Sequence, residues 1–139
     1  MGRLMAIDFG RKRCGIAVTD PLRIAANPLE TIPTASLIDF VKAYAAGQGG
    51  IDGIVVGLPR NLNGQDSESM RWLRPAIGRL KSAIAPVPVT FYDERFTSVL
   101  AHRAMIDGGM HKMARRDKAV VDRISAAIIL NDYLNSKQQ

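Results

Sequence analysis

The sequence predicts an α/β protein with a mixed five-stranded sheet, in which three antiparallel strands are followed by αβ units with helices on both faces. Two observations lead to this class. Short apolar runs separated by turn residues open the chain, a pattern typical of a β-meander. From residue 34 onward, apolar runs alternate with stretches whose apolar residues recur at helical spacing. We expect residues 1–139 to form one domain, because this length can bury a sound core.

Charge and composition limit the classes of function. Lys and Arg number 19 against 13 Asp and Glu, a net charge of +6, and such a surplus favours anionic partners, nucleic acid first. No apolar run reaches the roughly 18 residues of a membrane span, and the N-terminus lacks the pattern of a secretory signal. Cys14 is the single cysteine, which suits a packed core thiol in a reducing, cytoplasmic compartment.

The first hairpin carries the first candidate site residues. A strand over Leu4–Gly10 ends on Asp8 and a glycine, Arg11-Lys12-Arg13 forms a basic turn, and Cys14–Val18 is the second strand. A buried strand has little structural use for an acid at its end, because an unpaired buried charge is costly. An acid beside cations can hold a metal ion against a phosphate. Asp also commonly begins a turn, and that alternative stays open at this point.

The next elements follow from turn residues and apolar spacing. Asp20-Pro21 marks a turn, and residues 23–32 predict a third strand interrupted by Pro28. Thr34 or Ser36 can cap a helix that ends at Gly47. Residues 51–58 are continuous in apolar or small residues apart from Asp52, as expected of a central parallel strand.

The second helix has the clearest pattern in the chain. It follows a polar loop at residues 59–66, and its N-terminal cap is expected at Asp66 or Ser67. Pro75 is expected to kink this helix, and Trp72 lies off its apolar stripe, where packing on the flank or capping is favoured over base stacking. The stripe consists of Met70, Leu73, Ile77, Leu80 and Ile84.

The C-terminal third alternates acidic and basic features. Residues 89–92 predict a strand that runs out onto Asp93-Glu94-Arg95, and a short helix capped by Thr97 or Ser98 ends at Gly108. A last helix is expected over residues 117–134. Between the two helices lies a basic loop that contains Lys112, Arg115, Arg116 and Lys118.

Asp122 is the acid of interest in the last helix. Residues three, four and seven further on share its face, and these are Ser125, Ala126 and Ile129. Small side chains allow that face to lie close against a sheet, with Asp122 on the same side. The alternative is a simple salt bridge with Arg123 or Arg95.

Asp8, Glu94 and Asp122 have one common interpretation. Asp8 and Glu94 lie at the ends of predicted strands, and Asp122 lies near the start of a predicted helix. The fold can therefore bring the three side chains close together. Carboxylates held together repel one another unless cations offset their charge, and their hard oxygens suit Mg²⁺ or Mn²⁺. Two such ions roughly 3.5–4 Å apart can activate a water and stabilise the leaving oxygen of a phosphodiester.

Four ordered segments resemble one known family across nearly the whole chain. They are Asp8–Val18, Val55–Pro59, Asp93–Ser98 and Val121–Ala127, and they look like the four signatures of the bacterial YqgF (RuvX) family. The resemblance implies a ribonuclease-H-like fold and a nuclease. The family is described both as Holliday-junction resolvases and as nucleases that mature the precursor of 16S ribosomal RNA in ribosome biogenesis.

By this resemblance, Asp8, Glu94 and Asp122 match the family's metal-binding, catalytic acids. Asp93 is a further candidate ligand, although strand alternation points Asp93 and Glu94 to opposite faces. Arg11, Cys14 and Phe96 depart from the family's usual residues, and none of these departures removes an acid. The residues expected to bind nucleic acid by charge are Arg11, Lys12, Arg13, Arg95, Lys112, Arg115, Arg116 and Lys118.

The favoured function is therefore a hydrolase that cuts structured RNA, most of all the ribosomal precursor, with a junction resolvase as the alternative. A resolvase is expected to be a two-fold homodimer, whereas an RNA processor can act as a monomer. Two further alternatives are an ATP-binding protein, for which the chain lacks room for a second domain, and a non-catalytic RNA-binding ribosome-assembly factor. The latter needs none of the three acids.

Overall fold

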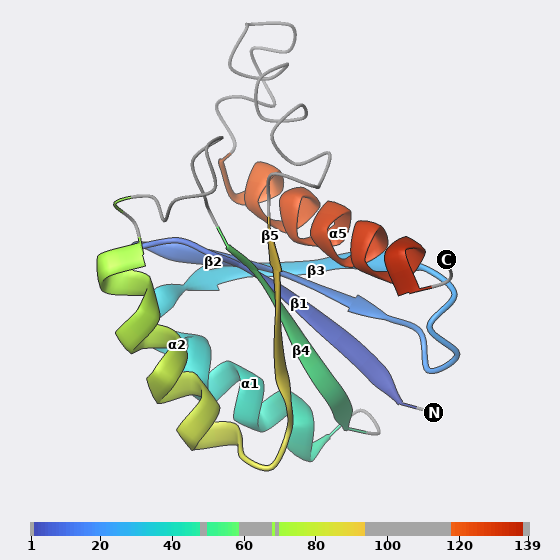
Figure 1. Cartoon of the computed structure of the whole chain (residues 1–139), viewed down its shortest axis with the longest axis horizontal. Helices are drawn as coiled ribbons and strands as arrows, with labels where there is room; N and C mark the ends of the chain where they lie inside the picture. The colour runs from blue at the N-terminus through green and yellow to red at the C-terminus, as the bar shows by residue number, and fades with distance from the viewer. Residues whose placement is uncertain (1, 48–49, 59–67, 69, 94–117, 138–139) are drawn as a thin grey trace, which may run out of the picture.

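Five strands form one sheet, as shown in the computed structural model, which describes residues 2–47, 50–58, 68, 70–93 and 118–137 (Figure 1). The strands are β1 (Arg3–Phe9), β2 (Arg13–Thr19), β3 (Ala26–Pro33), β4 (Ile51–Leu58) and β5 (Val89–Asp93). They lie in the order β3-β2-β1-β4-β5. The pairs β1–β2 and β2–β3 are antiparallel, whereas β1–β4 and β4–β5 are parallel, so the predicted mixed sheet is confirmed.

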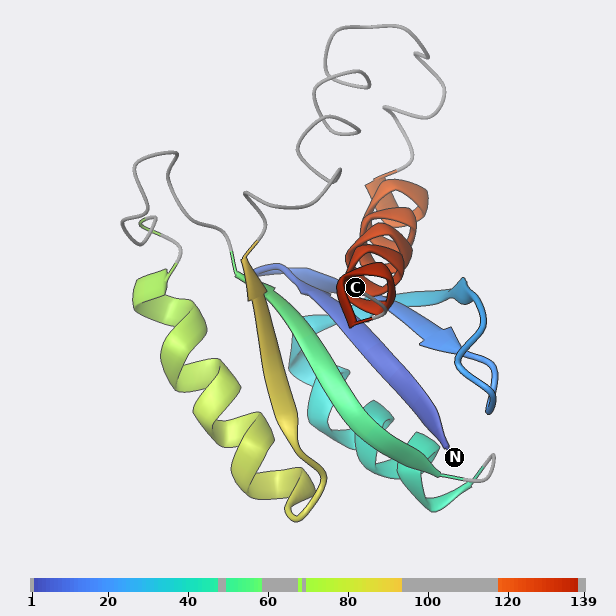
Figure 2. The same cartoon turned by 45° about the vertical axis from the view of Figure 1, so that its right-hand side comes forward.

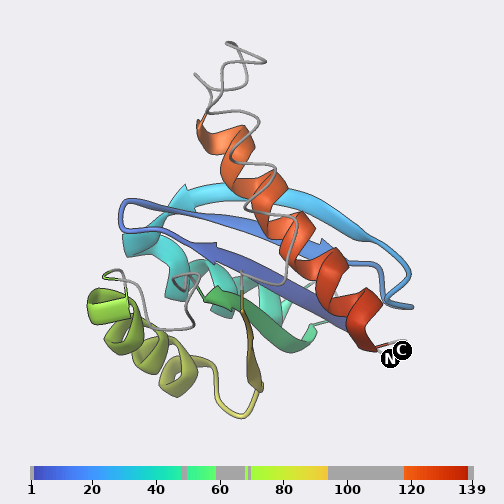
Figure 3. The same ribbon diagram turned by 45° about the horizontal axis from the view of Figure 1, so that its top comes forward.

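Helices cover both faces of the sheet, as predicted. A 3-10 turn (η1, Thr34–Ser36) leads into α1 (Leu37–Ala46), and α2 (Met70–Ile84) precedes β5. These two helices lie on one face, and α5 (Lys118–Lys137) lies on the other (Figure 2). Figure 3 shows α5 running across the sheet, where it contacts β1, β2 and β3. None of the described helices is both long and apolar enough to cross a membrane.

The two faces of the sheet have different cores. Under α1 and α2 the sheet presents large side chains such as Met5, Ile7 and Ile16. Under α5 it presents smaller ones, including Ala6, Ala17 and Val55. Because small side chains fill little depth, α5 can approach the strands closely. Side chains alternate between faces along a strand, so Asp8, two residues after Ala6, belongs to the α5 face.

Strand β3 begins three residues later than predicted. The Asp20 carboxylate accepts backbone N–H bonds from Leu22, Ile24 and Ala25 at 2.9–3.1 Å, which holds these residues in a turn. These bonds also lower the pKa of Asp20. At the other predicted interruption, Pro28, the strand continues with a register shift, because an edge strand tolerates a residue that lacks an N–H.

Of the two predicted caps of the first helix, Ser36 occupies the N-terminal cap position of α1, and Thr34 does not. Neither the Thr34 nor the Ser36 side chain caps a helix. Instead, the Thr34 hydroxyl donates to the Gly10 carbonyl at 2.6 Å, and the Thr34 N–H donates to the Lys12 carbonyl at 3.0 Å. Thr34 thus supports the β1–β2 turn, and the helix begins at Leu37 after the 3-10 turn.

Helix α2 keeps its predicted buried stripe at Met70, Leu73, Ile77, Leu80 and Ile84. Helical structure continues through Pro75, so this proline does not interrupt the helix. The predicted loop at 59–66, the caps at Asp66 or Ser67, and the short helix after Thr97 or Ser98 lie outside the described residues. The last helix spans Lys118–Lys137, close to the predicted 117–134.

Helix α5 approaches the sheet very closely at Gly15. A Cβ atom built on Gly15 would overlap the backbone carbonyl of Asp122. A glycine within a strand often marks such a close approach of another backbone segment. Here the absence of a side chain lets the N-terminal part of α5 rest directly on β2.

We predict that Gly15→Ala lowers the free energy of unfolding by about 1–3 kcal/mol, the usual cost of overpacking. Urea denaturation measures this value. Gly78→Ala is the matched control, because a Cβ on Gly78 in α2 meets nothing within 4 Å. That substitution should stabilise the protein by about 0.5–1 kcal/mol through helix propensity. A Gly15→Ala protein as stable as the wild type would contradict the close contact.

Candidate active site

Asp8 occupies the penultimate position of β1, on the face that α5 covers. It pairs in register with Gly15 of β2, and only 9% of its surface is exposed. Residues paired across antiparallel strands point to the same face. The side chain of Asp8 therefore lies beside Gly15, on the face that α5 covers.

Asp122 approaches Gly15 from α5, which lies over this face of the sheet. The predicted face of α5 is confirmed, because Ser125, Ala126 and Ile129 are all fully buried. The backbone of Asp122 rests against Gly15, the register partner of Asp8. Gly15 therefore adjoins both Asp8, its partner on β1, and the backbone of Asp122.

Arg13 supplies a cation to this pair of acids. Its Nε donates to Oδ2 of Asp122 at 2.9 Å, and the two side chains are 39% and 26% exposed. A half-exposed ion pair of this kind adds at most about 1 kcal/mol to stability. Its charge nevertheless offsets the repulsion between neighbouring carboxylates. The salt bridge considered for Asp122 therefore exists, and within the described part of the chain its partner is Arg13, in place of the expected Arg123 or Arg95.

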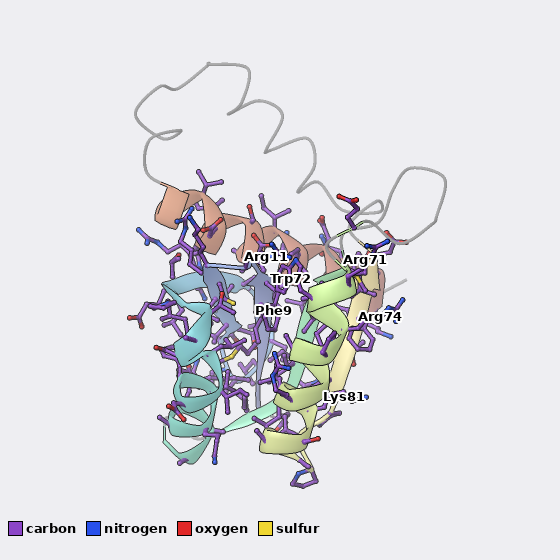
Figure 4. All side chains as sticks on the ribbon, turned by 90° about the vertical axis from the view of Figure 1, so that its left-hand side faces the viewer. Phe9, Arg11, Arg71, Trp72, Arg74 and Lys81 are labelled. Atoms are coloured by element: carbon purple, nitrogen blue, oxygen red, sulfur yellow. The ribbon has the colours of Figure 1, made fainter. Side chains whose placement is uncertain are left out.

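The basic turn divides its cations between the two faces of the sheet. Arg13 points toward α5, whereas the guanidinium of Arg11 lies 5.9 Å from the centre of the Trp72 ring in α2. Trp72 also packs against Phe9, with ring centres 6.0 Å apart (Figure 4). The predicted packing role of Trp72 on the flank of α2 is confirmed. Lys12, between the two arginines, is exposed.

Asp93 lies on a different face of the sheet from Asp8. It is the last residue of β5 and pairs with Leu58 of β4, whose side chain packs in the core under α1 and α2. Residues paired across parallel strands share a face, so Asp93 lies on the face opposite Asp8. Glu94, Arg95, Lys112, Arg115 and Arg116 lie outside the described residues, and Lys118 is described only as the first residue of α5.

The donor set around Gly15 fits a hard cation in its chemistry. Asp8 and Asp122 offer carboxylate oxygens, the ligands that Mg²⁺ and Mn²⁺ prefer. One turn after Asp122, the hydroxyl of Ser125 is buried without a hydrogen-bond partner in the described structure. Within those same residues, no three His, Cys, Asp or Glu side chains gather as a metal site. The third acid of the predicted site, Glu94, is outside them.

Sequence reasoning placed Gly15 in the second strand and gave it no role. The signal that could have revealed one was a glycine inside an otherwise apolar strand, Cys14–Val18, which commonly marks the approach of another backbone. Thr34 was also missed as a support of the turn, since its hydroxyl bonds to a residue 24 positions earlier.

Cys14 is a core thiol, as predicted, and it responds to both acids. It is fully buried, and this burial is the main reason that the pKa of its thiol is raised. Hydrogen bonds with Thr34 and the Gly10 backbone oppose the rise in pKa, and the carboxylates of Asp8 and Asp122 add to it. The thiol is therefore protonated at neutral pH and is no nucleophile.

Comparisons with known proteins agree with the resemblance seen in the motifs. The model of a family described as "RuvX: Holliday junction resolvase" matches residues 2–136. A relative from Phocaeicola vulgatus is 52% identical over 138 residues and 99% of each chain. One from Porphyromonas gingivalis is 49% identical over 98% of each chain. Both carry the name "Putative pre-16S rRNA nuclease".

A solved structure shares the fold. It is described as "T. thermophilus RuvC in complex with Holliday junction substrate", and its TM-score to this chain is 0.54. The match covers 99% of this chain and 96% of that chain at 14% identity. The predicted ribonuclease-H-like fold is confirmed by this likeness.

We predict that Asp8→Asn and Asp122→Asn each lower the pKa of the Cys14 thiol, because each substitution removes a nearby negative charge. An NMR titration of the single cysteine measures this pKa. Asp39→Asn, in the exposed first turn of α1, is the matched control and should leave the pKa unchanged. If neither variant at position 8 nor at position 122 moved the pKa, the two acids could not both lie near Cys14.

Proposed function

The chain belongs to the RuvX family, and from that membership we propose that it is a metal-dependent endonuclease that matures the 5′ end of 16S ribosomal RNA. The observation that carries the proposal is the contact of the Asp122 backbone with Gly15, the residue that pairs with Asp8 in the sheet. Carboxylates that lie near one another repel unless a cation offsets their charge. A bound divalent cation would offset this repulsion and could take part in the cleavage reaction.

Asp8, Glu94 and Asp122 are the proposed metal-binding and catalytic residues. Asp8 would hold the ion from β1 and Asp122 from α5, while Glu94 follows the end of β5 in the sequence. When bound, Mg²⁺ or Mn²⁺ supplies a water of lowered pKa and stabilises charge on the leaving oxygen. Asp93 is the weaker candidate, because its register places it on the other face of the sheet.

Arg13 would orient a carboxylate that binds the metal ion. Its guanidinium holds Oδ2 of Asp122 at 2.9 Å, which fixes the orientation of that carboxylate. The same positive charge would attract the phosphate that is to be cut. Lys12, exposed on the same turn, and the loop around Arg115 and Arg116 would contact neighbouring phosphates by charge, without reading sequence.

Ribosomal RNA is the preferred substrate because the relatives that are 39–52% identical are named as pre-16S rRNA nucleases. The family description names Holliday junctions instead, so cleavage of branched DNA is the second candidate. A junction resolvase would need a two-fold dimer, whereas RNA maturation could proceed with a monomer. A cytoplasmic location suits a ribosomal substrate and a single, unpaired cysteine.

Asp8→Asn, Glu94→Gln and Asp122→Asn should each abolish metal-dependent cleavage and leave folding and substrate binding intact, because each removes a charged ligand without changing side-chain size. The assay compares an RNA that spans the immature 5′ end of 16S ribosomal RNA with a four-way DNA junction. Each substrate is incubated with Mg²⁺, Mn²⁺ or EDTA. Asp39→Asn is the control for loss of one exposed acid and should cut normally.

The outcomes of this assay separate the candidate functions. Cutting of the RNA alone, abolished in the three variants, supports the proposed function, and symmetric cutting of the junction alone moves the assignment to DNA recombination. Tight binding without cutting of either substrate would favour a ribosome-assembly factor. Cutting by all three variants would mean that the site lies elsewhere.

Arg115→Ala combined with Arg116→Ala should weaken RNA binding and reduce the slope of affinity against salt by about 2, one for each arginine that no longer meets a phosphate. The measurement is RNA affinity across a series of salt concentrations in EDTA. Lys42→Ala, on the exposed surface of α1, controls for net charge. A salt slope equal to that of the wild type would remove the loop from the interface.

A further inference from the structure

A groove runs between α2 and the edge strand β5, on the face of the sheet opposite Asp8. It has a volume of about 270 Å³. Its floor is apolar and includes Leu58 and Ile77, and its rim carries Arg74, Lys81 and Phe91. The lining contains two cations and no acid. An apolar floor with cations at the rim suits a ligand that has one flat apolar part and one anionic part.

Phe91 is the aromatic surface of this groove. It lies in the middle of the edge strand β5 and is 43% exposed. The ammonium of Lys81 lies 6.0 Å from the centre of its ring. Base stacking on an exposed aromatic beside a cation is the standard way in which proteins hold unpaired nucleotides.

The charge of α2 favours an anionic occupant. Between residues 70 and 84 the helix carries four cations, Arg71, Arg74, Arg79 and Lys81, and no acid. Arg74 and Lys81 share the flank that faces β5, since they are two helical turns apart. Figure 4 shows Arg71, Arg74 and Lys81 spaced along this helix.

Gly78 keeps the groove open. It lies between Arg74 and Lys81 on the same flank and lines the groove. A Cβ on this residue would meet nothing within 4 Å, so packing within the described protein does not require a glycine here. Glycine is unfavourable inside a helix. Its presence at this position leaves room above the floor for a ligand.

We propose that this groove binds an unpaired nucleotide of single-stranded RNA, with the base against Phe91 and a phosphate beside Arg74 and Lys81. The proposal rests on the proposed function, in that RNA is the polyanion. It adds a binding position remote from the cleaved bond, on the opposite face of the sheet. Arg11 lies over the ring of Trp72, which belongs to the same helix as Arg74 and Lys81.

The test measures binding of two labelled probes in EDTA, a short single-stranded RNA of mixed sequence and a fully paired RNA. Phe91→Ala should weaken binding of the single strand about 5-fold or more, as expected for the loss of one stacked base, and change binding of the duplex little. Gly78→Leu should have the same effect by filling the groove. Lys81→Gln should reduce the salt slope by about 1.

Leu29→Ala is the matched control for Phe91→Ala, since Leu29 is 39% exposed on the opposite edge strand, β3. Equal affinities of the Phe91→Ala and Leu29→Ala proteins for the single strand would overturn the proposal. So would a change in oligomeric state for Phe91→Ala with RNA affinity unchanged, because the groove would then bind another protein. If Phe91→Ala weakened binding while the wild type cut neither RNA nor DNA, the groove would be supported and the nuclease rejected, so the two failures are distinguishable.

Discussion

The close contact between α5 and β2 at Gly15 is the constraint on which the rest of the structure depends. The sheet face under α5 is lined with small residues such as Ala6 and Ala17. Gly15 has no side chain that would collide with the backbone in the N-terminal part of the helix. Because the helix packs so closely on β2, Asp122 of α5 lies near the strand partner of Asp8. A larger residue at position 15 would lift the helix and separate Asp122 from Asp8.

The two faces of the sheet carry different kinds of side chain. One face carries Asp8, Arg13 and α5 with Asp122, and among the described residues Arg13 forms an ion pair with Asp122. The other face carries the larger apolar core, and α2 turns its cationic side outward above it. The β1–β2 turn serves both faces, because Arg11 points one way and Arg13 the other. A polyanion that wraps around the carboxyl edge of the sheet would meet positive charge on both sides.

Local patterns were enough to predict most of the fold, and contacts distant in sequence account for the rest. The strand at 51–58 and the buried stripe of α2 follow from the spacing of apolar residues, which the chain itself displays. The acid positions Asp8 and Asp122 also followed from such spacing. The partner of Asp122 could not be predicted, because Arg13 lies 109 residues away. The role of Thr34 as a support of the turn, rather than as a helix cap, likewise depends on tertiary packing.

The position of α5 as the last described element has a consequence for biosynthesis. Among the described elements, α5 is the last to be synthesised. Until α5 has been made, the sheet face with Ala6, Ala17 and Val55 has no cover. A nascent chain that has been made only as far as β5 therefore lacks Asp122 and exposes that apolar face.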